Sequence, residues 1–400
     1  MIARLIAVMA FAACTTNVLA EEPKLANATK VFPTSQPEYK RPNQRHAFAM
    51  RLSPDGKRVL YSRPVAGTEQ ADEDDRSARY ELVLRELDGG KETVLPIEPL
   101  ETGWRTVLTR FNMFDPAGTR LVLPNFKVET QQIDEHTSAS KMTVNWSIFN
   151  ITKGEMAGTT IEGDSRGPAK FAADGQALLL TAAAGRRKLA TKVISLSHIK
   201  ALPKSLTAPG WVQSVSPAGD VAVFFVPPPR PVHRPQPGQP MQRPPIRLVL
   251  WDLKTDRKLA EIPTHPRNGV LDDLETQWTA NGRYLYYVDR DEVPAKGQAD
   301  RATHRSVTRI WDRQAGKPAG MVTDAVPVGP GPGQMMVLAK RSSGGFLLHD
   351  AASGTEYPLG DASKKLIHAY GGEVIYAQES DDSDAEDVFV ADIIVPTAIE

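Results

Sequence analysis

The stretch Phe48 to Tyr61, FAMRLSPDGKRVLY, places an apolar run on each side of Ser53-Pro54-Asp55-Gly56. Proline presets one turn angle and glycine accepts a positive φ, so the stretch predicts a strand, a tight turn and a second strand. Recognisable copies of this unit recur to the end of the chain. The fold prediction follows from that repetition.

Alignment on the turn glycine gives seven copies, spaced 39 to 63 residues apart. Repeats of this period are typical of propellers and solenoids. The aligned glycines are Gly56, Gly118, Gly175, Gly219, Gly282, Gly333 and Gly372. An apolar segment follows each of them, as a strand that leaves a turn would.

A second signature lies in the latter half of most units, where two strands flank a polar turn. Ile246 to Ile262, IRLVLWDLKTDRKLAEI, is the clearest copy. Each unit therefore contains four short strands, and no amphipathic run is long enough for a core helix. The predicted fold is all-β, a seven-bladed β-propeller of four-stranded antiparallel blades.

The turns of the pattern Ser/Asp-Pro-Asp/Ala-Gly and the dipeptides Trp251-Asp252 and Trp311-Asp312 resemble the WD40-like (PD40) repeats of bacterial TolB-type propellers. The resemblance covers roughly residues 28 to 393. It implies the propeller fold. It implies no single activity, since such propellers serve as scaffolds, receptors and parts of larger peptidases.

The first twenty residues read as a secretory signal peptide, with Arg4, an apolar run and the small-residue site Val18-Leu19-Ala20. A periplasmic or secreted protein is the expectation. Phe11-Ala12-Ala13-Cys14 also resembles a lipoprotein box, which leaves a lipid anchor on Cys14 as an alternative. No later stretch approaches the ~20 apolar residues of a membrane helix, so no transmembrane segment is predicted.

Residues 21–400 are expected to form one propeller, with an N-terminal segment closing the ring. The predicted blades span approximately residues 44–98, 104–162, 167–208, 211–263, 270–323, 326–360 and 364–394. The last of these is one strand short. Residues 27–35, centred on Lys30-Val31-Phe32, would supply that outer strand and remove an open sheet edge.

Charge and cysteine content exclude some classes of partner and site. The chain has 48 basic and 48 acidic residues, which predicts no nucleic-acid partner. Its only cysteine is Cys14, which signal-peptide cleavage after Ala20 would remove, so the mature chain has no disulfide or thiolate ligand. No cofactor is predicted.

In an up-and-down blade with strands A to D, the B-to-C and D-to-A connections share one face. The long connections are B-to-C: residues 64–79, 127–141, 227–245, 289–305 and 379–387. Long loops on a rigid scaffold commonly carry binding function. This B-to-C face is therefore the predicted binding face.

Charge is segregated among the predicted loops. Blade 3 carries a basic triplet, Arg186, Arg187 and Lys188, and blade 4 adds Arg230, His233 and Arg234. Blade 7 carries an acidic triplet, Asp381, Asp382 and Asp384. These nine residues are the candidate ligand-binding residues, on opposite sides of the ring; solvated loop charge is the alternative interpretation.

Patterns for catalysis and metal binding are weak. Gly163-Asp164-Ser165-Arg166-Gly167 matches a nucleophile elbow but lacks the helix that must follow it, so no catalytic residue is predicted. Asp382, Asp384 and Glu386 alternate without the glycine of a calcium loop, and the histidines are scattered, so no metal site is predicted.

Two biased features have mainly structural interpretations. Residues 227–245, PPPRPVHRPQPGQPMQRPP, have the composition of a polyproline segment that cannot join a sheet. Trp104, Trp146, Trp211 and Trp278 favour core packing over a carbohydrate platform.

The predicted function is non-catalytic: an exported propeller that binds a protein or polymeric ligand through its B-to-C face. The alternative is a propeller enzyme of the lactonase or lyase type, with polar residues or a metal at the channel mouth.

Overall fold

A computed structural model describes most of the chain. The described residues are 22–32, 50–65, 79–101, 113–132, 138–163, 169–172, 174–183, 189–197, 203–226, 246–264, 276–293, 303–379 and 386–396. They contain strands, turns and bends with no helix, and hence none that could cross a membrane.

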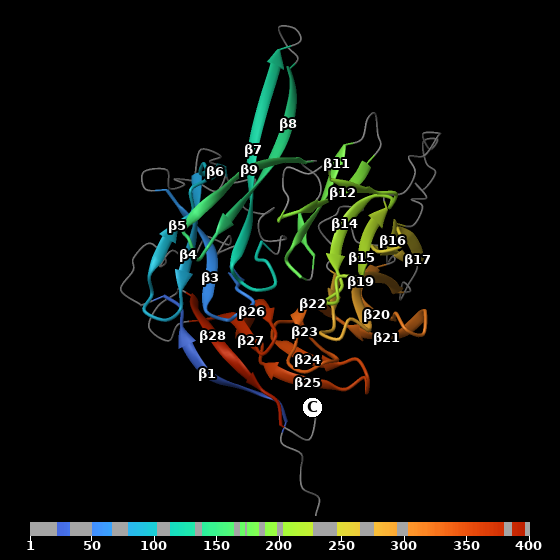
Figure 1. The fold of residues 1–400 in the computed structure, drawn as a ribbon. Coiled ribbons are helices and arrows are strands. Elements are labelled where there is room, and N and C mark those ends of the chain that lie inside the picture. Colours follow the sequence, from blue (N-terminus) through green and yellow to red (C-terminus); the bar gives the residue numbers. More distant parts are fainter. Residues whose placement is uncertain are drawn as a thin grey trace, which may run out of the picture.

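Seven antiparallel sheets stand around a common axis (Figure 1). Blade 1 has β2 (Arg51–Leu52), β3 (Arg58–Pro64), β4 (Arg79–Glu86) and β5 (Glu92–Val94), with β6 (Leu100–Glu101) also on β4. Blade 2 has β7 (Arg120–Gln132), β8 (Ser138–Asn150) and β9 (Glu155–Gly163). Blade 3 has β10 (Lys170–Phe171), β11 (Ala177–Ala183), β12 (Leu189–Ser195) and β13 (Lys204–Leu206).

The other four blades have four strands each. Blade 4 has β14 (Trp211–Val215), β15 (Val221–Val226), β16 (Ile246–Asp252) and β17 (Arg257–Thr264). Blade 5 has β18 (Thr276–Trp278), β19 (Tyr284–Val293), β20 (Thr303–Asp312) and β21 (Lys317–Thr323). Blade 6 has β22 (Ala325–Pro330), β23 (Met336–Arg341), β24 (Phe346–Asp350) and β25 (Glu356–Gly360). Blade 7 has β26 (Lys364–Tyr370), β27 (Glu373–Glu379), β28 (Glu386–Ile394) and β1 (Lys24–Lys30).

The predicted fold class, an all-β seven-bladed propeller, is confirmed. Blade 2 shows the most reduced inner strand, a single bridge between Phe114 and Leu121 that takes the place of strand A. The other six blades each have an inner strand.

The second strand of each blade contains a buried apolar run because both faces of the sheet are covered there. In β15, Val221, Val223 and Phe225 face blade 5, whereas Ala222 and Phe224 face blade 3. Side chains alternate between the two faces of a strand, so a continuous apolar run supplies buried side chains to both interfaces of the blade. The runs seen in the sequence after each turn have this origin.

Hydrophobic clusters fill every junction between neighbouring blades. One cluster joins blades 1, 2 and 3, and five further clusters join blades 3–4, 4–5, 5–6, 6–7 and 7–1. Trp146, Trp211 and Trp278 are buried in these clusters, 1%, 9% and 5% exposed, as core residues. Trp104 lies outside the described residues.

The N-terminal segment closes the ring. β1 pairs antiparallel with β28 from Lys24 opposite Ile394 to Lys30 opposite Phe389. Val31 and Phe32 then continue into the cluster between blades 7 and 1. Phe32 packs edge-on against Tyr61 of β3, with ring centroids 5.1 Å apart. The first strand of the chain thus completes the last blade and anchors it to the first.

Two connections expected as long loops are mostly strand. β7 and β8 remain paired from Arg120 opposite Asn150 out to Gln132 opposite Ser138, so the predicted loop at residues 127–141 is wrong for most of its length. β19 and β20 likewise continue to Val293 opposite Thr303, inside the predicted loop 289–305. Backbone pairing persists because both segments lack proline and glycine before the hairpin end.

We expect Phe32→Ala to lower the free energy of unfolding by about 3 kcal/mol, because it opens a cavity in the junction that closes the ring. Chemical denaturation of the full chain measures this change. Val94→Ala, at a side chain 46% exposed, is the control and should stay within about 0.5 kcal/mol of the parent. A Phe32→Ala protein as stable as the control would mean that the closing segment contributes little.

Candidate functional site

Seven equivalent residues lie at one level around the propeller axis. In six blades, the inner-strand residue pairs with the third residue of the next strand, as Arg51 does with Leu60 and Lys170 with Leu179. In blade 2 the corresponding residue is Met113, whose carbonyl accepts from Val122 N at 2.8 Å. We call this set the axial ring: Arg51, Met113, Lys170, Ser214, Gln277, Gly329 and His368.

Contacts between blades hold this level together. Leu52 N donates to Nδ1 of His368 at 3.2 Å, which joins blade 1 to blade 7. Gln277 Nε2 donates to the Val328 carbonyl of blade 6 at 3.1 Å. At Gly329, a Cβ would lie 2.1 Å from the Ala369 carbonyl of blade 7. Glycine is required there because the two inner strands approach too closely for a side chain.

The axial ring is cationic on one side. Arg51, Lys170 and His368 come from blades 1, 3 and 7, and repulsion from Arg51 acts on both other residues. Burial, and then this repulsion, lowers the pKa of Lys170 to about 8. The same two causes hold the pKa of His368 well below its usual value. At neutral pH the arc therefore carries Arg51 and Lys170 as cations and His368 as a neutral ring.

The tight A-to-B turns mainly connect blades. Arg120 Nη2 of blade 2 donates to the Gly175 carbonyl of blade 3 at 2.5 Å. Arg313 of blade 5 forms an ion pair with Asp220 in the turn of blade 4. The backbone N–H of Asn281 donates to the backbone carbonyl of Gln334 in blade 6 at 3.1 Å. These turns form one face, the turn face, opposite the B-to-C face.

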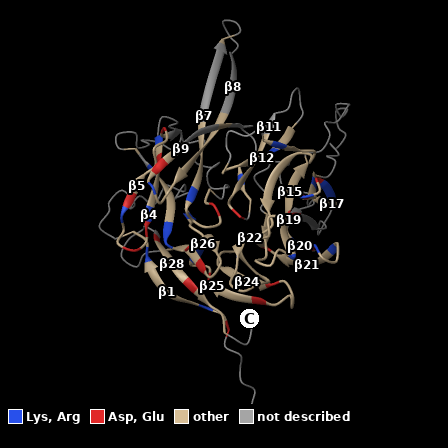
Figure 2. Cartoon of the chain, viewed as in Figure 1, with Lys and Arg blue, Asp and Glu red and all other residues tan. Residues whose placement is uncertain are grey.

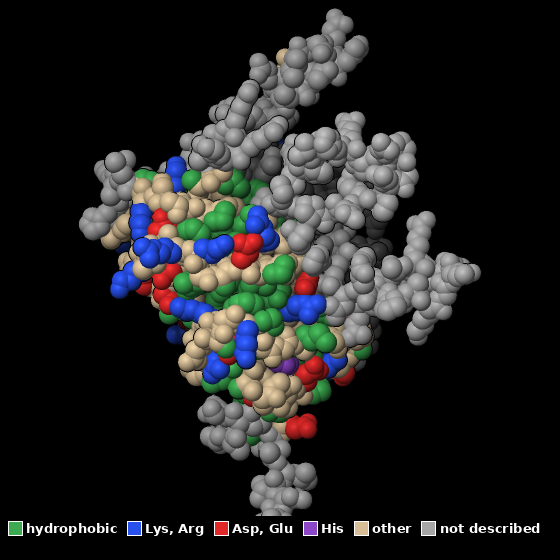
Figure 3. Space-filling model, turned by 90° about the vertical axis from the view of Figure 1, so that its right-hand side faces the viewer, with side chains coloured by type: hydrophobic (Ala, Val, Ile, Leu, Met, Phe, Trp, Pro, Cys, Tyr) green, Lys and Arg blue, Asp and Glu red, His purple; other side chains and the backbone are tan. Residues whose placement is uncertain are grey.

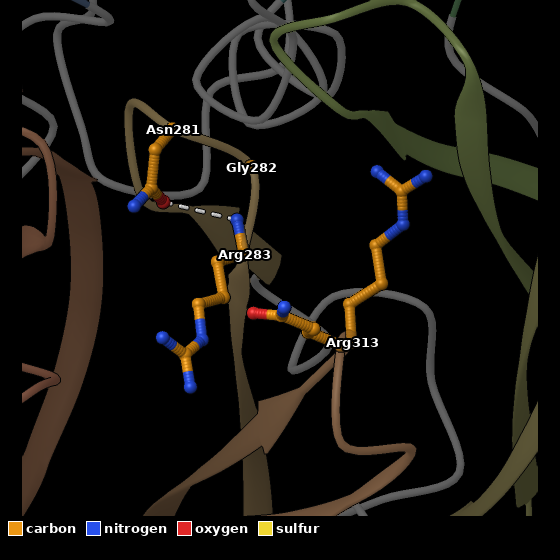
Figure 4. Close-up of a pocket in the computed structure, with 5 residues that line it drawn as sticks. Asn281, Gly282, Arg283 and Arg313 are labelled. Carbon is orange, nitrogen blue, oxygen red and sulfur yellow. Dashed lines mark hydrogen bonds between the residues drawn. The ribbon is translucent and has the colours of Figure 1, made fainter.

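An open pocket of about 320 Å³ lies on the turn face (Figure 4). Asn281, Gly282, Arg283, Arg313 and Gln314 line it. Arg283 is paired with Asp312 at 2.8 Å, and Arg313 with Asp220. Both guanidinium groups are neutralised within the fold, which makes this pocket a structural junction.

An acidic group lies at the junction of blades 7 and 1 on the same face. The Glu373 carboxyl covers Gly56, where a Cβ would lie 1.8 Å from Oε2. Burial first, and then repulsion from Asp392 and Asp55, raises the pKa of Glu373. No group of three potential metal ligands occurs among the residues that the structure describes.

The B-to-C face is marked by an arm. β7 and β8 have 13 residues each, whereas β23 and β24 of blade 6 have six and five. β9 accompanies β8 only as far as Val144 opposite Gly163. The pairs from Lys127 opposite Thr143 to Gln132 opposite Ser138 therefore form a two-stranded ribbon that projects beyond the ring (Figure 1).

All nine predicted binding residues lie outside the described residues: Arg186, Arg187, Lys188, Arg230, His233, Arg234, Asp381, Asp382 and Asp384. Ser165 and the proline-rich stretch 227–245 do so as well. The structure thus neither assembles nor separates these predicted sites.

The cationic arc was not predicted from the sequence, although the repeats contain its signal. Arg51, Met113, Lys170, Ser214 and Gln277 each lie five residues before the turn glycine of their repeat. In blade 6 the Gly331 amide bonds to the Met336 carbonyl as Ser53 does to Arg58, so Gln334 occupies the position of Gly56. The expected glycine, Gly333, is one residue out of register, which hides the alignment in that blade.

Surface charge outside these places is mixed. Figure 2 shows Lys and Arg positions and Asp and Glu positions distributed along the strands and turns of the described blades. Figure 3 faces the outer strands of blades 4 and 5, where apolar side chains lie among charges of both signs. Leu259 and Met321 are 50% and 51% exposed there. Lys258, Pro263 and Pro318 on these outer strands protect their open edges from pairing.

Comparisons with known proteins support the fold alone. No protein-family model and no curated protein sequence matches this chain. Among solved structures, hydrazine synthase of Kuenenia stuttgartiensis has a TM-score of 0.50 and 14% identity, covering 88% of this chain and 95% of that chain. The propeller domain of the Trilobed protease from Pyrococcus furiosus has a TM-score of 0.48 and 11% identity, covering 93% and 94%.

A chain of the mitotic checkpoint complex is similar at a TM-score of 0.46 and 10% identity, covering 98% of both chains. The similar structures thus include chains from enzymes and from a protein assembly. At such identities these comparisons carry no function, which has to be argued from this chain's own residues.

Glu373→Gln should stabilise the protein at about pH 7.5, because a raised carboxyl pKa in the folded state means that ionisation opposes folding. The gain should shrink towards about pH 4, where the parent carboxyl is protonated in both states. Urea denaturation at the two pH values measures the difference.

Asp312→Asn is a control of opposite sign. Its hydrogen bond from Arg283 is the main cause that lowers the pKa of Asp312, so this variant should lose stability at neutral pH and less in acid. Equal effects of Glu373→Gln at both pH values would contradict the assignment.

Proposed function

We propose that this chain is an exported β-propeller of the TolB type that binds a protein or polymeric ligand through its B-to-C face. The recurring Ser/Asp-Pro-Asp/Ala-Gly turns and the propeller architecture support the family assignment. The N-terminal signal pattern supports export to the periplasm or beyond.

The arm formed by β7 and β8 is the observation that carries the binding proposal. Each strand of 13 residues spans roughly 43 Å, so the ribbon extends well past the body of its blade. Two-stranded ribbons are marginally stable in water without a third strand or another covering element. Beyond Val144 the described structure provides no third strand for this ribbon.

A partner that covers the arm would supply that support. Within the described residues, neither edge of the ribbon is paired beyond Val144, and such edges pair readily with an added strand. The body of the propeller remains rigid through its seven junctions, so it fixes the direction in which the arm is presented.

Replacement of residues 128–142 by Asn-Gly shortens the arm to the pair Lys127 and Thr143 and tests this proposal. The melting temperature should hardly change, because no blade junction is altered. Affinity capture from an extract of the source organism, followed by mass spectrometry and reconstitution with each purified candidate, should yield a partner bound by the parent and lost by the variant. If every reconstituted partner binds both forms equally, the arm is not the binding element.

The charged loops give a second test of the same proposal. If a charged partner docks on the B-to-C face, raising salt from ~50 to ~500 mM should slow its association more than it speeds dissociation, as surface plasmon resonance would measure. Reversing the basic triplet to Glu should weaken an anionic partner, and neutralising the acidic triplet to Asn should weaken a cationic one. Should both variants bind every reconstituted partner as the parent does, the charged loops only solvate the protein.

A further inference from the structure

Lys170 carries its positive charge in a buried environment that disfavours the charged form. It lies on β10 between Ala169 and Phe171, which are 0% and 8% exposed. The Lys170 side chain is partly exposed to solvent. Because β10 is an inner strand, protein nevertheless surrounds the ammonium group. Its ammonium makes no hydrogen bond or ion pair with any described residue. A desolvated, unpaired ammonium costs free energy unless an anion compensates it.

The neighbouring cation increases that cost. Arg51 lies at the same level of the axial ring and repels the Lys170 ammonium. The residue between them in the ring is Met113, which is 1% exposed and carries no charge. Two cations on one side of the axis, separated by an uncharged position, are arranged to share one ligand group of opposite charge.

His368 adds a neutral donor to this arrangement. Its Nδ1 accepts the hydrogen bond from Leu52 N, so the proton of the neutral ring lies on Nε2. No described residue accepts a hydrogen bond from Nε2. The arc therefore combines a guanidinium, an ammonium and an imidazole N–H, which are groups suited to oxyanions.

We propose that Arg51 and Lys170 bind one oxyanion, a carboxylate or phosphate group of a small ligand, at the axis of the propeller near its turn face. The axial ring precedes the A-to-B turns, so this site is at the end of the ring opposite the arm. It is thus separate from the B-to-C face, and its test does not depend on that partner. Arg51, whose Nη1 also donates to the Met50 carbonyl at 3.1 Å, supplies one positive charge to the oxyanion, and Lys170 supplies a second.

The binding should depend on pH in a defined direction. The free Lys170 ammonium loses its proton near pH 8, so affinity should fall between about pH 7 and pH 9.5, while Arg51 stays charged. Among the described residues, the other charged or titratable groups at this level are Arg51 on β2 and His368 on β26. Strands β11 and β14, which contact β10, contain no titratable side chain. A bound oxyanion should in turn raise the pKa of Lys170.

Calorimetric titration of the full chain with inorganic phosphate, with succinate and with chloride at matched ionic strength is the test. Phosphate or succinate should bind at about pH 7 and chloride should not; whichever oxyanion binds identifies phosphate or carboxylate as the source. Lys170→Gln and Arg51→Gln should each weaken binding about tenfold or more, and Lys170→Arg should retain it. Lys192→Gln, on β12 of the same blade, is the matched control and should bind as the parent does.

Two further readouts keep the proposal testable if a variant fails to fold. The pH profile of the parent alone should show weaker binding at about pH 9.5. The NMR titration of ¹³C-methylated lysines should show one pKa near 8 that moves upward when the oxyanion is added. Absence of any oxyanion binding at neutral pH, or equal binding by the parent and Lys170→Gln, would overturn the proposal.

Discussion

The structure depends on hydrophobic packing between neighbouring sheets. A single four-stranded sheet of this chain cannot bury both of its apolar faces, and each face is covered only by the next blade. The middle strands make this plain: Leu285 and Tyr287 of β19 pack towards blade 4, whereas Tyr284 and Tyr286 pack towards blade 6. Stability is therefore a sum over junctions between neighbours, as in other repeat architectures. Removal of one junction exposes two faces at once.

Buried polar contacts between blades fix the positions of the packed sheets relative to one another. Tyr286 and His349 share a buried hydrogen bond of 2.7 Å between blades 5 and 6. Thr264 donates to the buried Asp289 carboxylate across blades 4 and 5 at 3.2 Å. Buried pairs of this kind cost free energy when one member is removed, so they disfavour any sliding of one blade against the next. The same precision holds seven backbone positions at one level around the axis.

The sequence predicted the architecture well because its signals were local. Ser53-Pro54-Asp55-Gly56 defines a turn through its own residues, and apolar runs such as Val221–Val226 define strands. It failed where the outcome depended on pairing beyond the turn: residues 127–141 were expected as a loop, yet β7 and β8 stay paired across most of them. Nothing in one strand of such a ribbon indicates how far its partner will follow.

The site was harder to predict for a different reason. Arg51 and Lys170 look ordinary in the sequence, each a single cation beside a buried apolar residue. They form a candidate site only because they occupy equivalent positions in two repeats. The fold brings these positions, 119 residues apart in the sequence, to one level of the propeller. Blades 6 and 7 obscured that equivalence, because Gln334 and Glu373 occupy the place of the turn glycine. The net charge of the whole chain is zero, so it gives no sign of an arc in which only Arg51 and Lys170 are charged.

The pairing of β1 with β28 has a kinetic consequence. Lys24 meets Ile394, so this contact closes a loop that contains nearly the whole chain, whereas other blades form from residues close in sequence. By the logarithmic dependence of loop entropy on length, this closure costs roughly 2 kcal/mol more than the closure of a single blade. Blades 1 to 6 can thus assemble as an open crescent from local hairpins. The meeting of the two ends of the chain therefore has the largest loop-closure cost in the fold, and we expect this seam to form last and to reopen first.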